Sequence, residues 1–277
     1  MTPPDRDQTA VDLHSHLVPG VDDGARTVDD VLEGVSRMAD RGIGHIVTTP
    51  HLEGSLTLMP ERFEARMDEM DRAFARGRAA VRESLPDMAF SRANEVALDH
   101  PEPDLSDPRL QLERGGYVLV EWPRLRVPPE SPRVLERVGG QGVGLLLAHP
   151  ERYRLGDRAL ERMSQWREAG AHFQVNYGSL VGVYGPEARK NALELLARGW
   201  VECLATDFHG RAGLRLFISE ARDHFRVRDG EPGPEAEAWH LLTRTNPRRF
   251  LEGEAPVPVP PVGRGETLWG RLTSLFR

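Results

Sequence analysis

The chain has 277 residues, of which 29% are charged and 39% hydrophobic, and this composition predicts one large domain with a substantial core. Its formal net charge is −7 and it has no long basic run, which argues against nucleic acid as a partner. The single cysteine, Cys203, excludes a disulfide framework or a thiolate zinc cluster within one chain. Because the N-terminal residues form no apolar leader and no apolar run could cross a membrane, we expect a cytoplasmic protein.

Short apolar or β-branched runs alternate along the chain with helical patterns. After the first expected strand, Thr27 is placed to cap a helix whose apolar residues recur at helical spacing as far as Met38. Pro60 and Pro186 each open a further expected helix, and Gly199 is placed to end the last of these. This alternation predicts an α/β fold with a parallel sheet or barrel. The expected strands are residues 11–14, 45–49, 88–95, 117–121, 143–149, 172–176 and 201–207.

The composition changes after about residue 253. Residues 254–266 are rich in proline and predict an extended linker. The last residues predict a short amphipathic helix, which either folds back on the barrel or docks on a partner or membrane surface. We therefore expect a barrel domain of residues 1–253 and a linker with a tail in residues 254–277. The apolar face of the tail would consist of Leu268, Trp269, Leu272, Leu275 and Phe276.

Every expected strand except the sixth ends on, or just before, a residue type that binds metal ions. The C-terminal ends of parallel barrel strands converge on one face, so these residues would meet in space. Residues i and i+2 of an extended segment point to the same side, which lets His14 and His16 share one cavity. Imidazole and carboxylate ligands without thiolate suit manganese, iron or zinc. The candidates are His14, His16, one acid of the pair Asp22 and Asp23, His51, Glu95, Glu121, His149, Asp207 and His209.

Several motifs of the chain occur in a specific combination: DLHSHLVPGVDDGA, TTPH, AHPERY, QVN and ATDFH, together with Glu95 and Glu121. In this combination they resemble the bacterial capsule-locus tyrosine-phosphatase family of the CpsB/CapC type, within the polymerase-and-histidinol-phosphatase (PHP) superfamily. The similar region runs from about residue 11 to about residue 250. The resemblance implies a distorted (βα)7 TIM-like barrel of the PHP type with three divalent ions, most often Mn²⁺, with iron or zinc as alternatives.

The resemblance also implies how the ligands divide among the ions. Asp23 matches the ligand position of the acidic pair, and Asp22 then becomes its neighbour. Glu95 would contact two ions. The three sets are His14, His16, Glu95 and Asp207; then Glu95, Glu121 and His149; and finally Asp23, His51 and His209.

Two arginines are candidates for binding the phosphate. Arg152 in HPERY matches a phosphate-binding arginine of the family, whereas Arg211 is a looser match because its loop is shorter. A hydroxide held between two ions would attack the phosphorus in line. The third ion or a ligand histidine, such as His149 or His209, would then assist the departure of the phenolate.

The resemblance predicts a protein-tyrosine phosphatase that acts on the tyrosine-rich tail of a bacterial autokinase controlling capsule or exopolysaccharide export. Two alternatives stay open: a small-molecule phosphatase of the histidinol-phosphatase type, and a non-catalytic assembly factor stabilised by metals. A thiol-based phosphatase is not expected, because it needs an arginine six residues after its cysteine, where this chain has His209. Cys203 lies in an apolar strand pattern and is predicted to be a core residue. The sequence leaves the oligomeric state open.

Overall fold

The computed structural model describes residues 9–113, 115–211, 213–225 and 233–263, and all of its paired strands are parallel. Within these ranges the strands form a three-stranded sheet of order β1-β2-β4 and a six-stranded sheet of order β3-β5-β6-β7-β8-β9. The strands are β1 (Ala10–Asp12), β2 (Ile43–Thr48), β3 (His51–Glu53), β4 (Ala89–Arg92), β5 (Glu95–Ala97), β6 (Tyr117–Glu121), β7 (Gly144–Ala148), β8 (Ala171–Asn176) and β9 (Cys203–Ala205).

Two of the seven expected strands are each broken in two. The strand expected over residues 45–49 ends at Thr48 as β2, and the chain pairs again as β3 after Pro50, whose nitrogen has no hydrogen to donate to a sheet. The strand expected over residues 88–95 divides into β4 and β5, and Asn94 Nδ2 donates to the Pro50 carbonyl at 3.3 Å across the two breaks. The prediction that Glu95 ends its strand is therefore wrong, because Glu95 begins β5, in register with His51 at the start of β3.

The two sheets close into a ring where β9 approaches β1. A parallel bridge joins Ser15 to Phe208. On either side of it, Asp207 N donates to the His14 carbonyl at 2.9 Å and His16 N donates to the Phe208 carbonyl at 2.8 Å. With each broken strand counted once, seven strand positions surround the barrel, which confirms the predicted α/β barrel.

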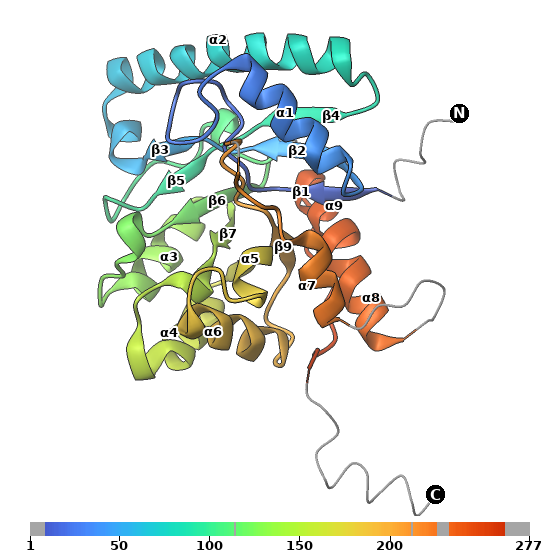
Figure 1. The fold of residues 1–277 in the computed structure, drawn as a ribbon. Helices are drawn as coiled ribbons and strands as arrows, with labels where there is room; N and C mark the ends of the chain where they lie inside the picture. The colour runs from blue at the N-terminus through green and yellow to red at the C-terminus, as the bar shows by residue number, and fades with distance from the viewer. Residues whose placement is uncertain (1–8, 114, 212, 226–232, 264–277) are drawn as a thin grey trace, which may run out of the picture.

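Helices pack around the outside of the strands (Figure 1). The first begins where the sequence predicts, because Thr27 Oγ1 accepts from Asp30 N at 3.1 Å while Asp30 Oδ2 accepts from Thr27 N at 3.0 Å. The second and sixth begin at Pro60 and Pro186, as expected. The helices are α1 (Val28–Ala39), α2 (Pro60–Ser84), α3 (Ser131–Gly139), α4 (Ala159–Glu168), α5 (Tyr177–Leu180), α6 (Pro186–Leu196), α7 (Ile218–His224), α8 (Pro234–His240) and α9 (Asn246–Leu251), with a π-helical turn over Leu241–Thr245.

The core has an inner and an outer layer, as the alternation of side chains along barrel strands requires. In β6, Leu119 belongs to the cluster inside the barrel, whereas Val118 and Val120 belong to the cluster that packs against the helices. Cys203 is fully buried in the inner cluster, which confirms its prediction as a core residue. Phe250 of α9 also joins the inner cluster.

The proline-rich segment lies extended against the barrel as far as residue 263. Asn246 holds it by accepting from Val257 N at 2.7 Å and donating to the Val257 carbonyl at 2.9 Å. Val262 N donates to the Leu196 carbonyl at 3.0 Å, and Val259 is buried. The amphipathic tail expected after it lies outside the described residues, so the division at residue 253 stays a proposal. None of the described helices is long and apolar enough to cross a membrane.

Candidate metal centre

Nine side chains of metal-binding types gather at the C-terminal end of the barrel, and they are the nine that the sequence predicts. They form four overlapping groups, in each of which one ligand atom per residue lies within 4.8 Å of the others. The groups are His16, Asp23, His51 and His209; His14, Glu95 and His149; His14, His16 and Asp207; and His51, Glu95 and Glu121.

Glu95 lies at the centre of this cluster, with imidazole nitrogens around its carboxylate. Its Oε2 lies 3.0 Å from His51 Nδ1, 3.2 Å from His14 Nε2 and 3.4 Å from His16 Nε2. Its Oε1 lies 3.1 Å from His149 Nε2. One carboxylate is thus shared by four imidazoles, as expected of a ligand that bridges two ions.

Asp207 completes the innermost set. Its Oδ1 lies 3.5 Å from His14 Nε2 and 3.4 Å from His16 Nε2, so these three residues converge with Glu95. Glu121 lies between two histidines, 3.9 Å from His149 Nε2 and 3.6 Å from His51 Nδ1. The distances are compatible with the first two ligand sets that the resemblance implies.

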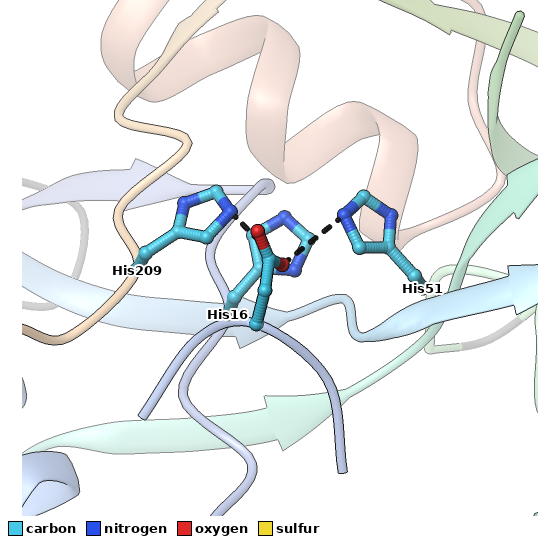
Figure 2. A group of neighbouring side chains, drawn as sticks. His16, His51 and His209 are labelled. Carbon is cyan, nitrogen blue, oxygen red and sulfur yellow. Dashed lines mark ion pairs between the residues drawn. The ribbon is translucent and has the colours of Figure 1, made fainter. Parts of the chain in front are cut away.

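The third set lies at the solvent side of the cluster. Asp23 Oδ1 lies 3.5 Å from His51 Nε2 and 3.4 Å from His209 Nε2. Figure 2 shows the rings of His16, His51 and His209 gathered around this position, and the centroids of the His16 and His209 rings are 4.2 Å apart. The Asp23 and His51 side chains are 63% and 39% exposed, whereas Glu95 is fully buried. The centre is therefore buried on one side and open on the other.

The acidic pair is divided between two roles by its geometry. Asp22 accepts from His16 Nδ1 at 2.8 Å and from the backbone of Gly24 and His51 at 2.9 Å and 3.2 Å. It therefore orients the His16 ring from behind, a common partner for a metal-binding histidine. Asp23 faces the other ligands, and we propose it as the ligand of the pair.

Two candidate ligands have backbone conformations that are rare outside glycine. His149 has φ 36° and Asp207 has φ 50°, both in the left-handed region. Such conformations are sparsely populated and cluster at functional sites. His149 directly follows β7, and Asp207 lies two residues after the end of β9. The left-handed backbone turns the His149 side chain toward Glu95 and the Asp207 side chain toward His14. Residue types alone do not reveal this feature.

Strand β8 supplies residues to which the sequence assigned no role, because its C-terminal end carries no metal-ligand type and its one histidine, His172, lies near its start. Gln174 Oε1 accepts from His14 Nδ1 at 2.8 Å, and Gln174 Nε2 donates to Asn176 Oδ1 at 2.8 Å. Asn176 Nδ2 in turn donates to Asp207 Oδ2 at 2.9 Å. The chain of amides fixes His14 and Asp207 in position. The i, i+2 spacing within QVN is the signal that could have indicated this role.

The charges of the cluster fit divalent cations. Burial, and after it the negative charge of Glu95, raise the pKa of Glu121, as expected for adjacent carboxylates without a cation between them. Among the described residues, the buried Oε2 of Glu95 and Nδ1 of His51 have no hydrogen-bond partner, although the two atoms face each other. Imidazole nitrogens and carboxylate oxygens without thiolate suit manganese, iron or zinc. The residues present therefore fit the metals that the resemblance implies.

Metal uptake by the stripped protein is expected to release protons. Burial alone would lower the pKa of His14, but the charges of Glu95 and Asp207 raise it to about 9. Without metal, this histidine stabilises the fold fully below its unfolded pKa of about 6.5. That contribution is lost as the pH rises through about 9. Because an ion needs the neutral ring, titrating Mn²⁺ calorimetrically at pH near 7.5 in buffers of different ionisation enthalpy should show roughly one proton released or more. Uptake without proton release would contradict this protonation state.

Arg152 lies at the edge of the cluster, on the turn that follows β7. Its guanidinium pairs with Asp207, and its Cζ lies 4.1 Å from the centroid of the Tyr184 ring. The turn is anchored by the buried Glu151, which accepts from Ser179 Oγ at 2.6 Å and from Asn176 N at 3.1 Å. Arg152 is thus held beside the metal ligands by Asp207, which pairs with its Nη1, and by the Tyr184 ring, which lies over one face of the guanidinium.

The second candidate arginine, Arg211, follows His209 by two residues and is only partly buried. Within the described residues its Nε is buried without a hydrogen-bond partner. No described contact joins it to the ligand cluster, and a role in binding phosphate stays a proposal.

Comparison with known proteins places this arrangement in a family. Residues 10–252 match the family model described as capsular polysaccharide synthesis, CpsB/CapC. The chain belongs to the CpsB/CapC family. This confirms the resemblance found in the sequence.

Two tyrosine-protein phosphatases are similar to this chain along most of their length. The chain is 26% identical over 213 residues to the tyrosine-protein phosphatase YwqE of Bacillus subtilis (strain 168), covering 76% of this chain and 82% of that protein. It is 24% identical over 255 residues to the tyrosine-protein phosphatase CpsB of Streptococcus pneumoniae, covering 87% and 98%.

Solved structures support the fold. A chain from a study of YwqE from Bacillus subtilis and CpsB from Streptococcus pneumoniae, described as unique metal-dependent tyrosine phosphatases, superimposes with a TM-score of 0.71 at 22% identity. The match covers 92% of this chain and 100% of that one. An amidohydrolase from Mycoplasma synoviae superimposes with a TM-score of 0.50 at 12% identity, covering 94% and 92%. The barrel of the CpsB/CapC family is thus the fold of this chain.

Proposed function

We propose that this chain is a metal-dependent protein-tyrosine phosphatase. The observation that carries the proposal is the position of Arg152, held beside a cluster of imidazoles and carboxylates that fits divalent cations. A planar guanidinium with paired N–H groups matches the oxygens of a phosphate, which a lysine does not reproduce. The names of the relatives from Bacillus subtilis and Streptococcus pneumoniae support the same activity.

The proposed ligands are the nine clustered residues, and the proposed ions are three divalent cations, with manganese preferred from the resemblance. When bound, such ions activate water and offset the charge on phosphoryl oxygens. Arg152 would bind a non-bridging oxygen of the phosphate and orient the ester. Burial, and after it the charge of His16, lower the pKa of His209, which keeps this half-buried ring neutral at pH 7. His209 and His149 are proposed to assist at the leaving oxygen.

The open C-terminal end of the barrel, here called the mouth, supports a protein substrate. The third ligand set is open to solvent, with Asp23 63% and His51 39% exposed, so a phosphate on a side chain can reach it. The loops that follow β3 and β8 also expose apolar side chains at this end of the barrel, namely Leu58, Met59, Val183 and Tyr184. A small phosphate ester would favour an enclosed pocket that buries most of its surface. We propose a phosphotyrosine protein as substrate and, from the resemblance, a bacterial autokinase tail.

Removing the Tyr184 side chain is expected to weaken binding of phosphotyrosine substrates. The ring stacks on Arg152 and is 38% exposed, so it can steady the guanidinium and offer contact to an aromatic ester. Aromatic and cation–π contacts contribute about 1 kcal/mol, so Tyr184→Ala should raise KM for a phosphotyrosine peptide about fivefold. Tyr184→Phe should keep the wild-type KM. Equal KM values for the alanine variant and the wild type would exclude this role.

The experiment that tests the proposed function compares two substrates with the manganese-loaded full chain. One is a phosphotyrosine peptide and the other is histidinol phosphate. We expect kcat/KM for the peptide to be higher by about a hundredfold or more, since the open mouth makes few contacts to a small ester. Turnover of histidinol phosphate alone would favour a small-molecule phosphatase. No turnover of either substrate would favour a metal-stabilised assembly factor.

A further inference from the structure

A second cavity lies on the flank of the barrel, away from the metal ligands. It has a volume of about 590 Å³ and is lined by the residues after α1, by α7 and α8 and by the π-helical turn. Ala10 and Gly42, at the N-terminal ends of β1 and β2, form part of its wall. It therefore opens near the opposite end of the strands from the ligand cluster and shares no residue with it. Its volume lies within the range of small-molecule sites.

The cavity gathers positive charge in a protein of net charge −7. Arg41, Arg222 and Arg244 line it, with Asp40 as a lining acid. Burial, and after it the charges of Arg244 and Arg248, lower the pKa of His240, which also lines the cavity. The side chains that line the cavity thus carry more positive than negative charge.

Two of these arginines have no acidic partner among the described residues. The side chain of Arg244 makes no hydrogen bond or ion pair within the described residues, and its Nε is buried. Within the described residues, the side chain of Arg41 makes one hydrogen bond, which it donates to Ser219 Oγ at 3.0 Å. By contrast, the half-buried Arg167 pairs with Glu202 at 2.7 Å. Since the partly buried guanidinium of Arg244 is costly without a counter-charge, and the exposed Arg41 adds a second positive charge beside it, the cavity favours an anion.

An aromatic wall lies beside the arginines. Trp239 packs with its ring centroid 5.2 Å from that of Phe225 and 5.9 Å from that of Tyr177, and it is only partly buried where it lines the cavity. The chain then forms the π-helical turn Leu241–Thr245, which carries Arg244 toward the same space. Such turns are rare and occur often at functional sites. A rigid indole beside guanidinium groups suits a planar ring that carries phosphate.

We propose that this flank cavity binds a small organic phosphate with a planar ring, in the chemical class of the nucleoside phosphates. The phosphate would pair with Arg41 and Arg244, and the ring would lie against Trp239. This site is separate from the metal centre, and the proposal does not depend on the phosphatase function.

The test is calorimetric titration of the full chain with ADP after the metals have been removed with a chelator. We expect saturable binding of one ADP per chain. Arg244→Ala and Arg41→Ala should each weaken it about tenfold, the loss expected for one charge-assisted contact. Arg78→Ala, at an exposed position on α2, should bind as the wild type does. Arg152→Ala should also leave it unchanged, because Arg152 lies at the metal centre.

Three results would overturn the proposal: absence of saturable binding, equal affinity in the Arg41 and Arg244 variants and the wild type, or loss of binding in Arg152→Ala. Circular dichroism of each variant checks its fold. Because Arg41 is exposed, Arg41→Ala is expected to fold, and it still tests the proposal if Arg244→Ala does not fold. Phosphatase activity of Arg41→Ala should remain at the wild-type level without ADP, which separates this outcome from failure of the proposed function.

Discussion

Glu95→Gln is expected to lower phosphotyrosine hydrolysis by at least about 10³-fold, the scale seen when one main electrostatic contributor is removed from an active site. Its carboxylate lies within 3.4 Å of imidazole nitrogens of His14, His16, His51 and His149. The glutamine has almost the same shape but no charge, and one of its two terminal atoms no longer accepts. Two ligand sets would be weakened together, so bound metal should fall as well.

The measurement is metal content by mass spectrometry and peptide turnover on the same preparations. Glu202→Gln provides a matched control, since Glu202 is buried and accepts from Arg167 Nη1 and from Phe173 N, both at 2.7 Å. This control should lose about 1–3 kcal/mol of unfolding free energy but keep its metal and activity. If Glu95→Gln retained both full metal content and wild-type turnover, Glu95 would not be a shared ligand.

Arg152→Lys is expected to lower kcat/KM for an aryl phosphate by about 10²- to 10³-fold while the metal content stays near that of the wild type. Lysine keeps the positive charge but loses the planar fork that can bind two oxygens at once. It also loses the flat face that rests 4.1 Å from the Tyr184 ring. The distinction between lost metal and lost phosphate binding separates this variant from Glu95→Gln.

The kcat/KM of Arg152→Lys is measured by steady-state kinetics with p-nitrophenyl phosphate. Arg154→Lys is the control variant. Arg154 follows two residues later in the same segment and is exposed, so its replacement should leave kcat/KM unchanged. A value for Arg152→Lys within about threefold of the wild type would show that the fork does not bind the phosphate.

The barrel could be predicted from the sequence because its strands and helices alternate with clear patterns. Thr27 and the acids after it indicate the start of α1, and the structure contains the expected cap. The apolar run of β6 is continuous because Leu119 faces the barrel interior while Val118 and Val120 face the helices. The sequence does not predict that the chain returns to the sheet after Pro50. A proline next to a strand indicates the end of the strand as readily as a break within it.

The nine candidate ligands could be found because residue types at successive strand ends converge in a parallel barrel. Their finer arrangement depends on tertiary contacts that no spacing encodes. The left-handed turns at His149 and Asp207 and the amide chain from Gln174 to Asn176 place the ligands through long-range hydrogen bonds. The family resemblance supplied the choice of Asp23 over Asp22, and the contacts of Asp22 now give a physical reason for it.

We propose that the clustered histidines and carboxylates hold divalent ions on which phosphotyrosine hydrolysis depends. The most direct measurement strips the full chain with a chelator, adds Mn²⁺ stepwise, and follows bound metal and phosphate release from a phosphotyrosine peptide in the same samples. We predict no activity in the stripped protein and a rise that follows occupancy up to about three ions per chain. Full activity in the stripped protein, or Mn²⁺ binding without any activity, would contradict the account.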